Sequence, residues 1–96
     1  MSKLEDDIAK LTDDVLTKAD AWAAIKIVGE VVGLGSVMAV AGVVISALFG
    51  PGGLAIGSIG ACRYMLYKCG TVYCDLPSDQ RKLVAKLCKK LYDVIN

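Results

Sequence analysis

An uncharged run extends from Val31 to Cys62 and limits the folds that this chain can adopt. A group of helix-breaking residues at positions 50–53 interrupts the run, because proline lacks an amide proton and glycine costs about 1 kcal/mol in a helix interior. Residues 31–49 would form a helix about 28 Å long at 1.5 Å per residue, close to the thickness of a bilayer's hydrocarbon core. The run therefore either inserts into a membrane or forms the core of a helical domain.

The uncharged run predicts an apolar helical hairpin over residues 31–67 with its turn at residues 50–53. The second arm, residues 54–67, contains Arg63 and is too short to cross a bilayer by itself. Small residues recur at spacings that allow close approach between helix backbones. The predicted turn consists of Gly50, Pro51, Gly52 and Gly53, and the predicted helix-packing residues are Gly29, Gly33, Gly57 and Gly60.

Charged residues gather at the two ends of the chain. Residues 1–30 contain four Lys and seven Asp or Glu, a balance of −3, whereas residues 63–96 contain seven Lys or Arg and three Asp, a balance of +4. Within residues 1–30 and 78–96, apolar residues recur every three or four positions, as on one face of an amphipathic helix. The sequence therefore predicts an acidic amphipathic helix over residues 1–30 and a basic one over residues 78–96.

These elements predict a single all-α domain over residues 1–96. Its architecture would be a four-helix bundle, or a helical hairpin in which the glycine-rich apolar centre is flanked by two amphipathic helices. Residues 68–77 would form a cysteine-containing loop before the basic helix, since Gly70 suits a helix end and Pro77 suits the start of the next helix. A chain of 96 residues supports one modest core.

Four cysteines lie in the second half of the chain. If the helices on either side of the loop are antiparallel, Cys62 lies level with Cys88, and Cys69 closes the loop with Cys74. We therefore predict the disulfides Cys62–Cys88 and Cys69–Cys74, each contributing about 2 to 4 kcal/mol, in an oxidising compartment. In a reducing compartment the four cysteines would instead be free thiols that behave as small hydrophobic residues.

Several classes of function are disfavoured by composition. The chain has no histidine, which is the commonest general base and the commonest metal ligand. The cysteine spacing does not match that of zinc sites, and the segment "FGPGG" lacks the lysine and hydroxyl residue of a phosphate-binding loop. The basic residues are confined to one helix and the net charge is +1, which disfavours nucleic acid binding. We therefore expect no enzymatic activity, cofactor or metal.

An apolar hairpin beside a basic amphipathic helix predicts a protein that interacts with membranes, preferentially anionic ones. Basic residues near a bilayer contribute about 1 kcal/mol each, and aromatic residues suit its interface. In solution the two oppositely charged helices would pack together and cover the hairpin, and an anionic surface would release it. The predicted basic residues are Arg81, Lys82, Lys86, Lys89 and Lys90, and the predicted interfacial aromatics are Trp22, Tyr64, Tyr67 and Tyr73.

Three interpretations remain open from the residues. The first is a membrane-permeabilising protein of the toxin, antimicrobial or effector type. The second is a small integral membrane protein, such as a holin-like pore former, that forms homo-oligomers through its small-residue faces. The third is a soluble helical domain that binds a partner or a lipid between its helices. We expect a membrane-associated location, which would be extracellular if the disulfides form and an intracellular membrane otherwise.

Residues 41–61, "AGVVISALFGPGGLAIGSIGA", resemble the glycine-rich and alanine-rich centre of the interferon-alpha-inducible small membrane protein family. This resemblance implies a small intracellular membrane protein, often mitochondrial, without enzymatic activity. The charged ends and the four cysteines depart from that family. A broader likeness is to helical bacteriocins and saposin-like bundles, although the six-cysteine saposin framework is absent. The match to the family rests on Gly53, Leu54, Ala55, Gly57, Ser58, Ile59 and Ala61.

Overall fold

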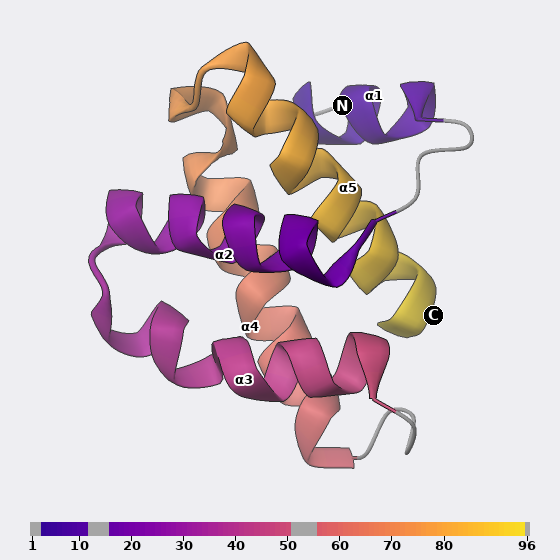
Figure 1. Cartoon of the computed structure of the whole chain (residues 1–96). Coiled ribbons are helices and arrows are strands. Elements are labelled where there is room, and N and C mark those ends of the chain that lie inside the picture. Colours follow the sequence, from indigo (N-terminus) through magenta and orange to yellow (C-terminus); the bar gives the residue numbers. More distant parts are fainter. Residues whose placement is uncertain (1–2, 12–15, 51–55, 96) are drawn as a thin grey trace.

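Short amphipathic and apolar helices make up this protein. The computed structural model describes residues 3–11, 16–50 and 56–95, and in these ranges the chain forms five α-helices and one short 3₁₀ helix, without strands. The elements are α1 (Lys3–Lys10), α2 (Lys18–Val32), α3 (Gly35–Phe49), α4 (Ile56–Val72), η1 (Tyr73–Asp75) and α5 (Ser78–Ile95), as Figure 1 shows. The predicted all-α class is confirmed, although the described helices outnumber those of a four-helix bundle.

The additional helix arises because residues 1–30 do not form one helix, contrary to the prediction. α1 ends at Lys10, and α2 begins at Lys18. Thr17 has an extended backbone with φ −81° and ψ 163°, and its Oγ1 accepts a hydrogen bond from the Asp20 amide at 3.0 Å. This N-cap satisfies an amide that lacks a partner within the helix, and it defines the start of α2.

The first arm of the predicted hairpin begins later than expected. α2 extends into the uncharged run as far as Val32, and Gly33 then adopts a φ of 91°, a left-handed conformation that favours glycine. This turn leads into α3 at Gly35. At the other end of α3, the Gly50 amide donates a hydrogen bond to the Ser46 carbonyl at 2.8 Å. The other predicted turn residues, Pro51, Gly52 and Gly53, lie outside the described residues.

The prediction of a loop over residues 68–77 is wrong for its first half. α4 continues through Cys69 and Gly70 to Val72, and η1 then follows over Tyr73–Asp75. The continuation buries Cys69 and Val72 on the same face as Met65, which offsets the cost of a glycine within the helix. The helix after Pro77 begins at Ser78, so the start of the predicted basic helix is confirmed.

The helices pack around α2, which contacts α3, α4 and α5. In Figure 1, α2 and α3 lie side by side and α4 passes behind them, while α1 lies against α5 and η1 near one end of the molecule. The acidic α1 therefore rests on the basic α5. The described part of the chain measures 32 × 30 × 24 Å along its principal axes.

One face of each longer helix is buried in a shared core. Spacings of three and four residues separate the buried positions, as expected for amphipathic packing. The uncharged α3 follows the same rule, since one face is buried and the opposite face carries only small or apolar side chains at the surface. The buried residues of α2, α3, α4 and α5 include Ala24, Ile25, Val28, Val37, Ala41, Val44, Cys62, Met65, Cys69, Val84, Leu87, Cys88 and Leu91.

The predicted helix-packing glycines have different roles. Gly29 is buried where α2 meets α3, and a Cβ there would lie 3.4 Å from Met38 Sδ. Gly33 is a turn residue and Gly60 faces open space, with no atom within 4 Å of an added Cβ at either position. The prediction that these two pack against another helix is therefore wrong. The packing of Gly57 lies outside the described part of the structure.

Candidate functional site

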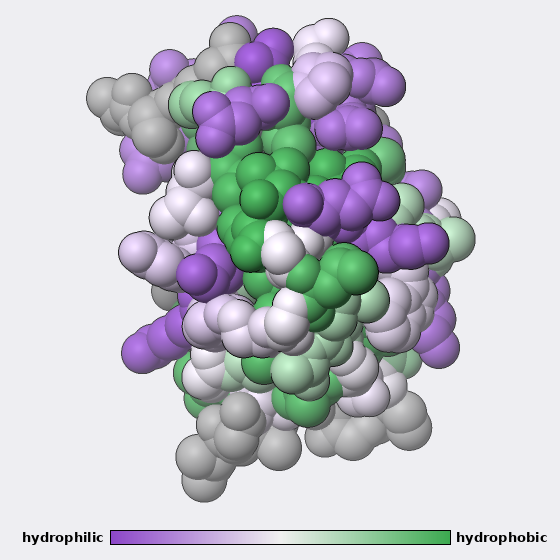
Figure 2. Space-filling model, turned by 90° about the vertical axis from the view of Figure 1, so that its left-hand side faces the viewer, coloured by the Kyte–Doolittle hydropathy of each residue, from purple (hydrophilic) through white to green (hydrophobic). Residues whose placement is uncertain are grey.

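Three apolar side chains are exposed together where α2 turns into α3. Val31, Val32 and Leu34 have exposed fractions of 46%, 37% and 64%, and we call these three residues the turn patch. Figure 2 views the molecule from the side of this turn and shows apolar surface along the middle of the face, with hydrophilic residues on both sides. A contiguous exposed apolar patch of this kind is typical of a contact surface for a membrane or another protein.

An aromatic and basic rim lies beside the turn patch. The Ser36 and Tyr64 hydroxyls form a hydrogen bond that joins the start of α3 to α4. The Lys68 ammonium lies 5.5 Å from the centre of the Tyr64 ring and 5.7 Å from that of Tyr67, within the range of cation–π interactions. The fold therefore places two predicted interfacial aromatics next to one cation, near the turn.

The other two predicted interfacial aromatics lie elsewhere. Trp22, on α2, is partly exposed, but Tyr73 is buried in η1. Tyr73 donates a hydrogen bond to Asp7 Oδ2 at 2.5 Å and thereby ties η1 to α1. Burial and the hydrogen bond to Asp7 raise the pKa of Tyr73 well above its ordinary value. Tyr73 is therefore buried inside the fold and not at its surface, where an interfacial aromatic was expected.

The predicted basic residues lie along α5 and are mostly half-buried. Lys82 is exposed, whereas Arg81, Lys86, Lys89 and Lys90 are partly covered. Lys89 Nζ donates a hydrogen bond to the Leu11 carbonyl at 3.2 Å, just after the end of α1. A cavity of about 380 Å³, lined by residues of both charge signs, lies where α1 meets α5. Part of the basic face is therefore engaged with the acidic end of the chain.

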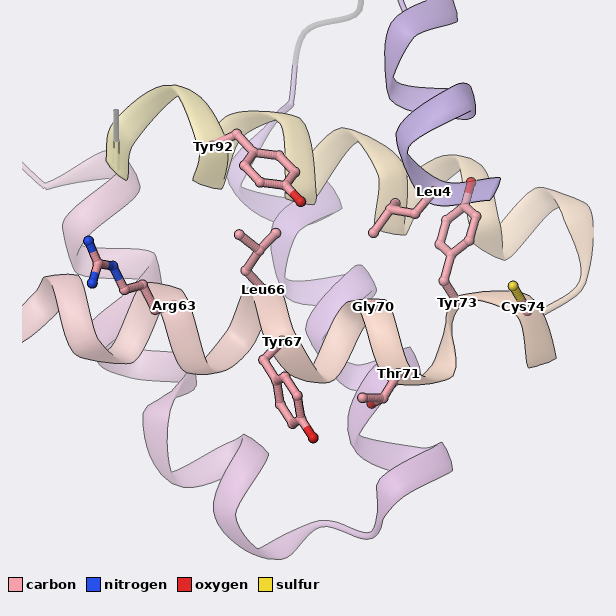
Figure 3. Close-up of a pocket in the computed structure, with 9 residues that line it drawn as sticks. All are labelled: Leu4, Arg63, Leu66, Tyr67, Gly70, Thr71, Tyr73, Cys74 and Tyr92. Atoms are coloured by element: carbon pink, nitrogen blue, oxygen red, sulfur yellow. The ribbon is translucent and has the colours of Figure 1, made fainter. Parts of the chain in front are cut away.

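A second surface feature is an apolar groove between α1, α4, η1 and α5. It has a volume of about 480 Å³, within the range of small-molecule sites. Figure 3 shows Arg63 at one end, Cys74 at the other, and Leu4, Leu66 and Tyr92 between them. The nine residues that line the groove are Leu4, Arg63, Leu66, Tyr67, Gly70, Thr71, Tyr73, Cys74 and Tyr92.

Few polar groups in the groove are free to meet a ligand. The Tyr73 hydroxyl is bonded to Asp7, and the Thr71 hydroxyl donates to the Lys68 carbonyl at 2.8 Å. Burial is the main cause that raises the pKa of Tyr92, so its hydroxyl stays protonated at neutral pH. Among the described residues that line the groove, Arg63 is the charged one, and its side chain is exposed.

The cysteines do not form the predicted disulfides. All four are free thiols in the structure; Cys62, Cys69 and Cys88 are buried, and Cys74 is exposed. Hydrogen bonding with Cys69, together with burial, raises the pKa of Cys88. Because α4 continues past Cys69, this residue faces α5 as Cys88's neighbour instead of closing a loop with Cys74. No group of three potential metal ligands occurs in the described ranges.

Sequence reasoning did not identify the turn patch or the groove. The segment "VVGLG", residues 31–35, contains a signal for the patch, since two glycines flank an apolar residue directly after two valines. The groove has no local signal, because α1, α4 and α5 come from segments that are far apart in the sequence.

Among the described helices, none combines the length and hydropathy needed to cross a membrane. Comparisons with protein-family models, curated proteins and solved structures found no match for this chain. The resemblance of residues 41–61 to the interferon-alpha-inducible family therefore stays a prediction.

Proposed function

We propose that this protein binds membrane surfaces and that the turn patch is the part that enters the lipid interface. The observation that carries the proposal is the joint exposure of Val31, Val32 and Leu34 at one tight turn. Full burial of a valine or leucine side chain is worth about 1.5 to 3 kcal/mol, so three partly exposed ones supply a useful fraction of a membrane affinity.

The rim beside the patch supports the same proposal. Tyrosine is enriched at the level of lipid headgroups, where its ring is buried and its hydroxyl stays hydrated. Lys68 lies over Tyr64 and Tyr67 and adds a positive charge at that level. An anionic bilayer would attract this charge, which favours anionic over neutral lipid.

We propose that membrane binding has a second stage, in which the basic helix α5 takes part. In the fold described above, α1 lies on α5 and η1. The Tyr73–Asp7 hydrogen bond ties it to η1, and the Lys89–Leu11 hydrogen bond ties the residue just after it to α5. An anionic surface would compete with α1 for Lys89 and its basic neighbours, release α1, and expose the apolar surface of α5 and η1 that α1 covers. Permeabilisation of the bilayer, as in a toxin or antimicrobial protein, would then depend on this second stage.

The test is co-sedimentation of detergent-free protein with vesicles of phosphatidylcholine, alone or mixed with phosphatidylglycerol. The patch variant is Val31→Ser with Leu34→Ser, and the matched control is Val43→Ser. Val43 lies on α3 outside the patch and has an exposed fraction of 44%, close to that of Val31. All these side chains are at the surface, so each variant should fold, as circular dichroism will verify.

We expect wild type and the Val43→Ser control to bind mixed vesicles and the patch variant to bind at least tenfold more weakly, since about 1.4 kcal/mol corresponds to a factor of ten. Equal binding of the patch variant and wild type would contradict the proposed contact. A wild-type protein that ignores both vesicle types would contradict membrane binding altogether, and a protein extractable only with detergent would favour the integral, oligomeric alternative.

A further inference from the structure

We infer that the apolar groove is a binding site for a free single-chain carboxylate, with the carboxylate on Arg63 and the alkyl chain lying between Leu4 and Leu66. This inference goes beyond the proposed function, because a soluble ligand in the groove requires no bilayer. The groove shares no residue with the turn patch and only Tyr67 with the rim beside it.

The charge of the lining determines the type of head group. Arg63 is charged, exposed and at one end of the groove, while the remaining lining residues are neutral. A guanidinium matches a carboxylate with two parallel hydrogen bonds, and it disfavours a cationic ligand. The Tyr92 hydroxyl faces the middle of the groove in Figure 3, and the exposed Tyr67, one helical turn from Arg63, is a second neutral donor on that side.

The length and composition of the groove determine the tail. From Arg63 to Thr71 the groove follows α4 for about 12 Å, at 1.5 Å per residue, which is comparable with the extended length of decanoate. Leu4, Leu66 and the tyrosine rings offer an apolar lining along that length. At Gly70 an added Cβ would meet no atom within 4 Å, so the missing side chain leaves open space beside the helix.

The occupied hydroxyls fix the orientation of the ligand. At the Cys74 end, the Tyr73 hydroxyl donates to Asp7, which leaves an apolar ring and a thiol rather than a hydroxyl donor for an anion. A carboxylate at this end would also lie close to the acidic side chain of Asp7. The tail therefore lies toward Cys74 and the head toward Arg63.

The experiment is a calorimetric titration with decanoate, kept below its micelle concentration, in the absence of lipid. Arg63→Gln removes the charge, and Gly70→Leu fills the groove. Lys26→Gln is the matched control, since Lys26 is an exposed cation on α2 that lines neither the groove nor the cavity between α1 and α5. Decanol and decyltrimethylammonium test the need for an anionic head. Circular dichroism reports whether Gly70→Leu folds. If it does not fold, Arg63→Gln still tests the inference, because Arg63 lies at the surface and its replacement should leave the fold intact.

We expect saturable binding of decanoate to wild type and to Lys26→Gln. Arg63→Gln should bind about tenfold more weakly or worse, because hydrogen bonds to charged groups are worth about 1.5 to 3 kcal/mol. Gly70→Leu should lose decanoate binding and keep vesicle binding, which separates this inference from the proposed function. The inference is overturned if no saturable binding occurs, if Arg63→Gln binds as well as wild type, or if decanol binds as tightly as decanoate.

Discussion

At the scale of single residues, burial decides the chemistry of the cysteines. Cys62, Cys69 and Cys88 are fully buried, and burial raises the pKa of Cys62 while hydrogen bonding with Cys69 raises that of Cys88. A thiol that stays protonated and out of solvent reacts slowly, because the thiolate is the nucleophile. Cys74 lies in η1 and its thiol is exposed to solvent.

We therefore expect Ellman's reagent to label one thiol rapidly in the reduced, folded protein and four in guanidinium chloride. Cys74→Ser should abolish the rapid phase and leave three slow thiols. Rapid labelling of two or more thiols in the native wild type would contradict the burial of the other three.

Tyr73 gives the protein a specific sensitivity to alkaline pH. Its folded pKa lies above its ordinary value near 10, so the folded state keeps a proton that the unfolded chain loses. The free energy of unfolding is therefore expected to fall as the pH rises above about 10. The raised pKa of Tyr92 also makes the free energy of unfolding fall at alkaline pH.

Tyr73→Phe should lower the free energy of unfolding at neutral pH by about 1.5 to 3 kcal/mol, the usual worth of a hydrogen bond to a charged group. It should also reduce the loss of stability above pH 10. Urea denaturation at pH 7 and pH 10.5 measures both effects, with the exposed Tyr67→Phe as control. A variant whose pH dependence matches wild type would show that Tyr73 does not carry this sensitivity.

At the scale of the helices, several glycines occupy positions that require no glycine. Gly42 lies within α3 and Gly60 within α4, both exposed and both without an atom within 4 Å of an added Cβ. Glycine in a helix interior is unfavourable relative to alanine because its unfolded backbone has more freedom to lose. Gly33 differs, since its φ of 91° strains any other side chain.

Gly42→Ala and Gly60→Ala should each raise the free energy of unfolding by about 0.5 to 1 kcal/mol, whereas Gly33→Ala should lower it. Thermal melts of the three variants provide the measurement. If Gly42→Ala or Gly60→Ala instead lowers the free energy of unfolding, the added methyl group must clash with another molecule. That result would show that Gly42 or Gly60 lies in a contact with a partner or with a second copy of the chain.

At the scale of the whole molecule, charge separation in the sequence becomes contact between the two ends of the chain. α1 packs on α5 and η1, held by Asp7 and by the Leu11 carbonyl. An eight-residue helix has little stability by itself, so its order depends on this docking. α1 is therefore the element that an anionic surface would displace most easily.

Hydrogen exchange measures that displacement. We expect the amides of α1 to exchange faster when mixed phosphatidylcholine and phosphatidylglycerol vesicles are added, and to be unaffected by phosphatidylcholine alone, because only the anionic surface competes for the lysines of α5. Unchanged exchange in vesicle-bound protein would eliminate the release of α1 while leaving the turn patch as the membrane contact.

The amino-acid sequence was sufficient to predict the all-α class, the start of α5 and the segregation of charge, because helix periodicity and helix breakers are local properties of the chain. The break between α1 and α2 was also encoded locally, in the Thr17 cap, although the continuous apolar spacing concealed it. The packing of the helices, by contrast, sets which face of the uncharged α3 is buried, places Cys69 beside Cys88 and leaves a groove between Leu4 and Leu66. These outcomes depend on the rotation and offset of helices from distant segments, and a helix that is apolar on every side carries no local signal of its orientation.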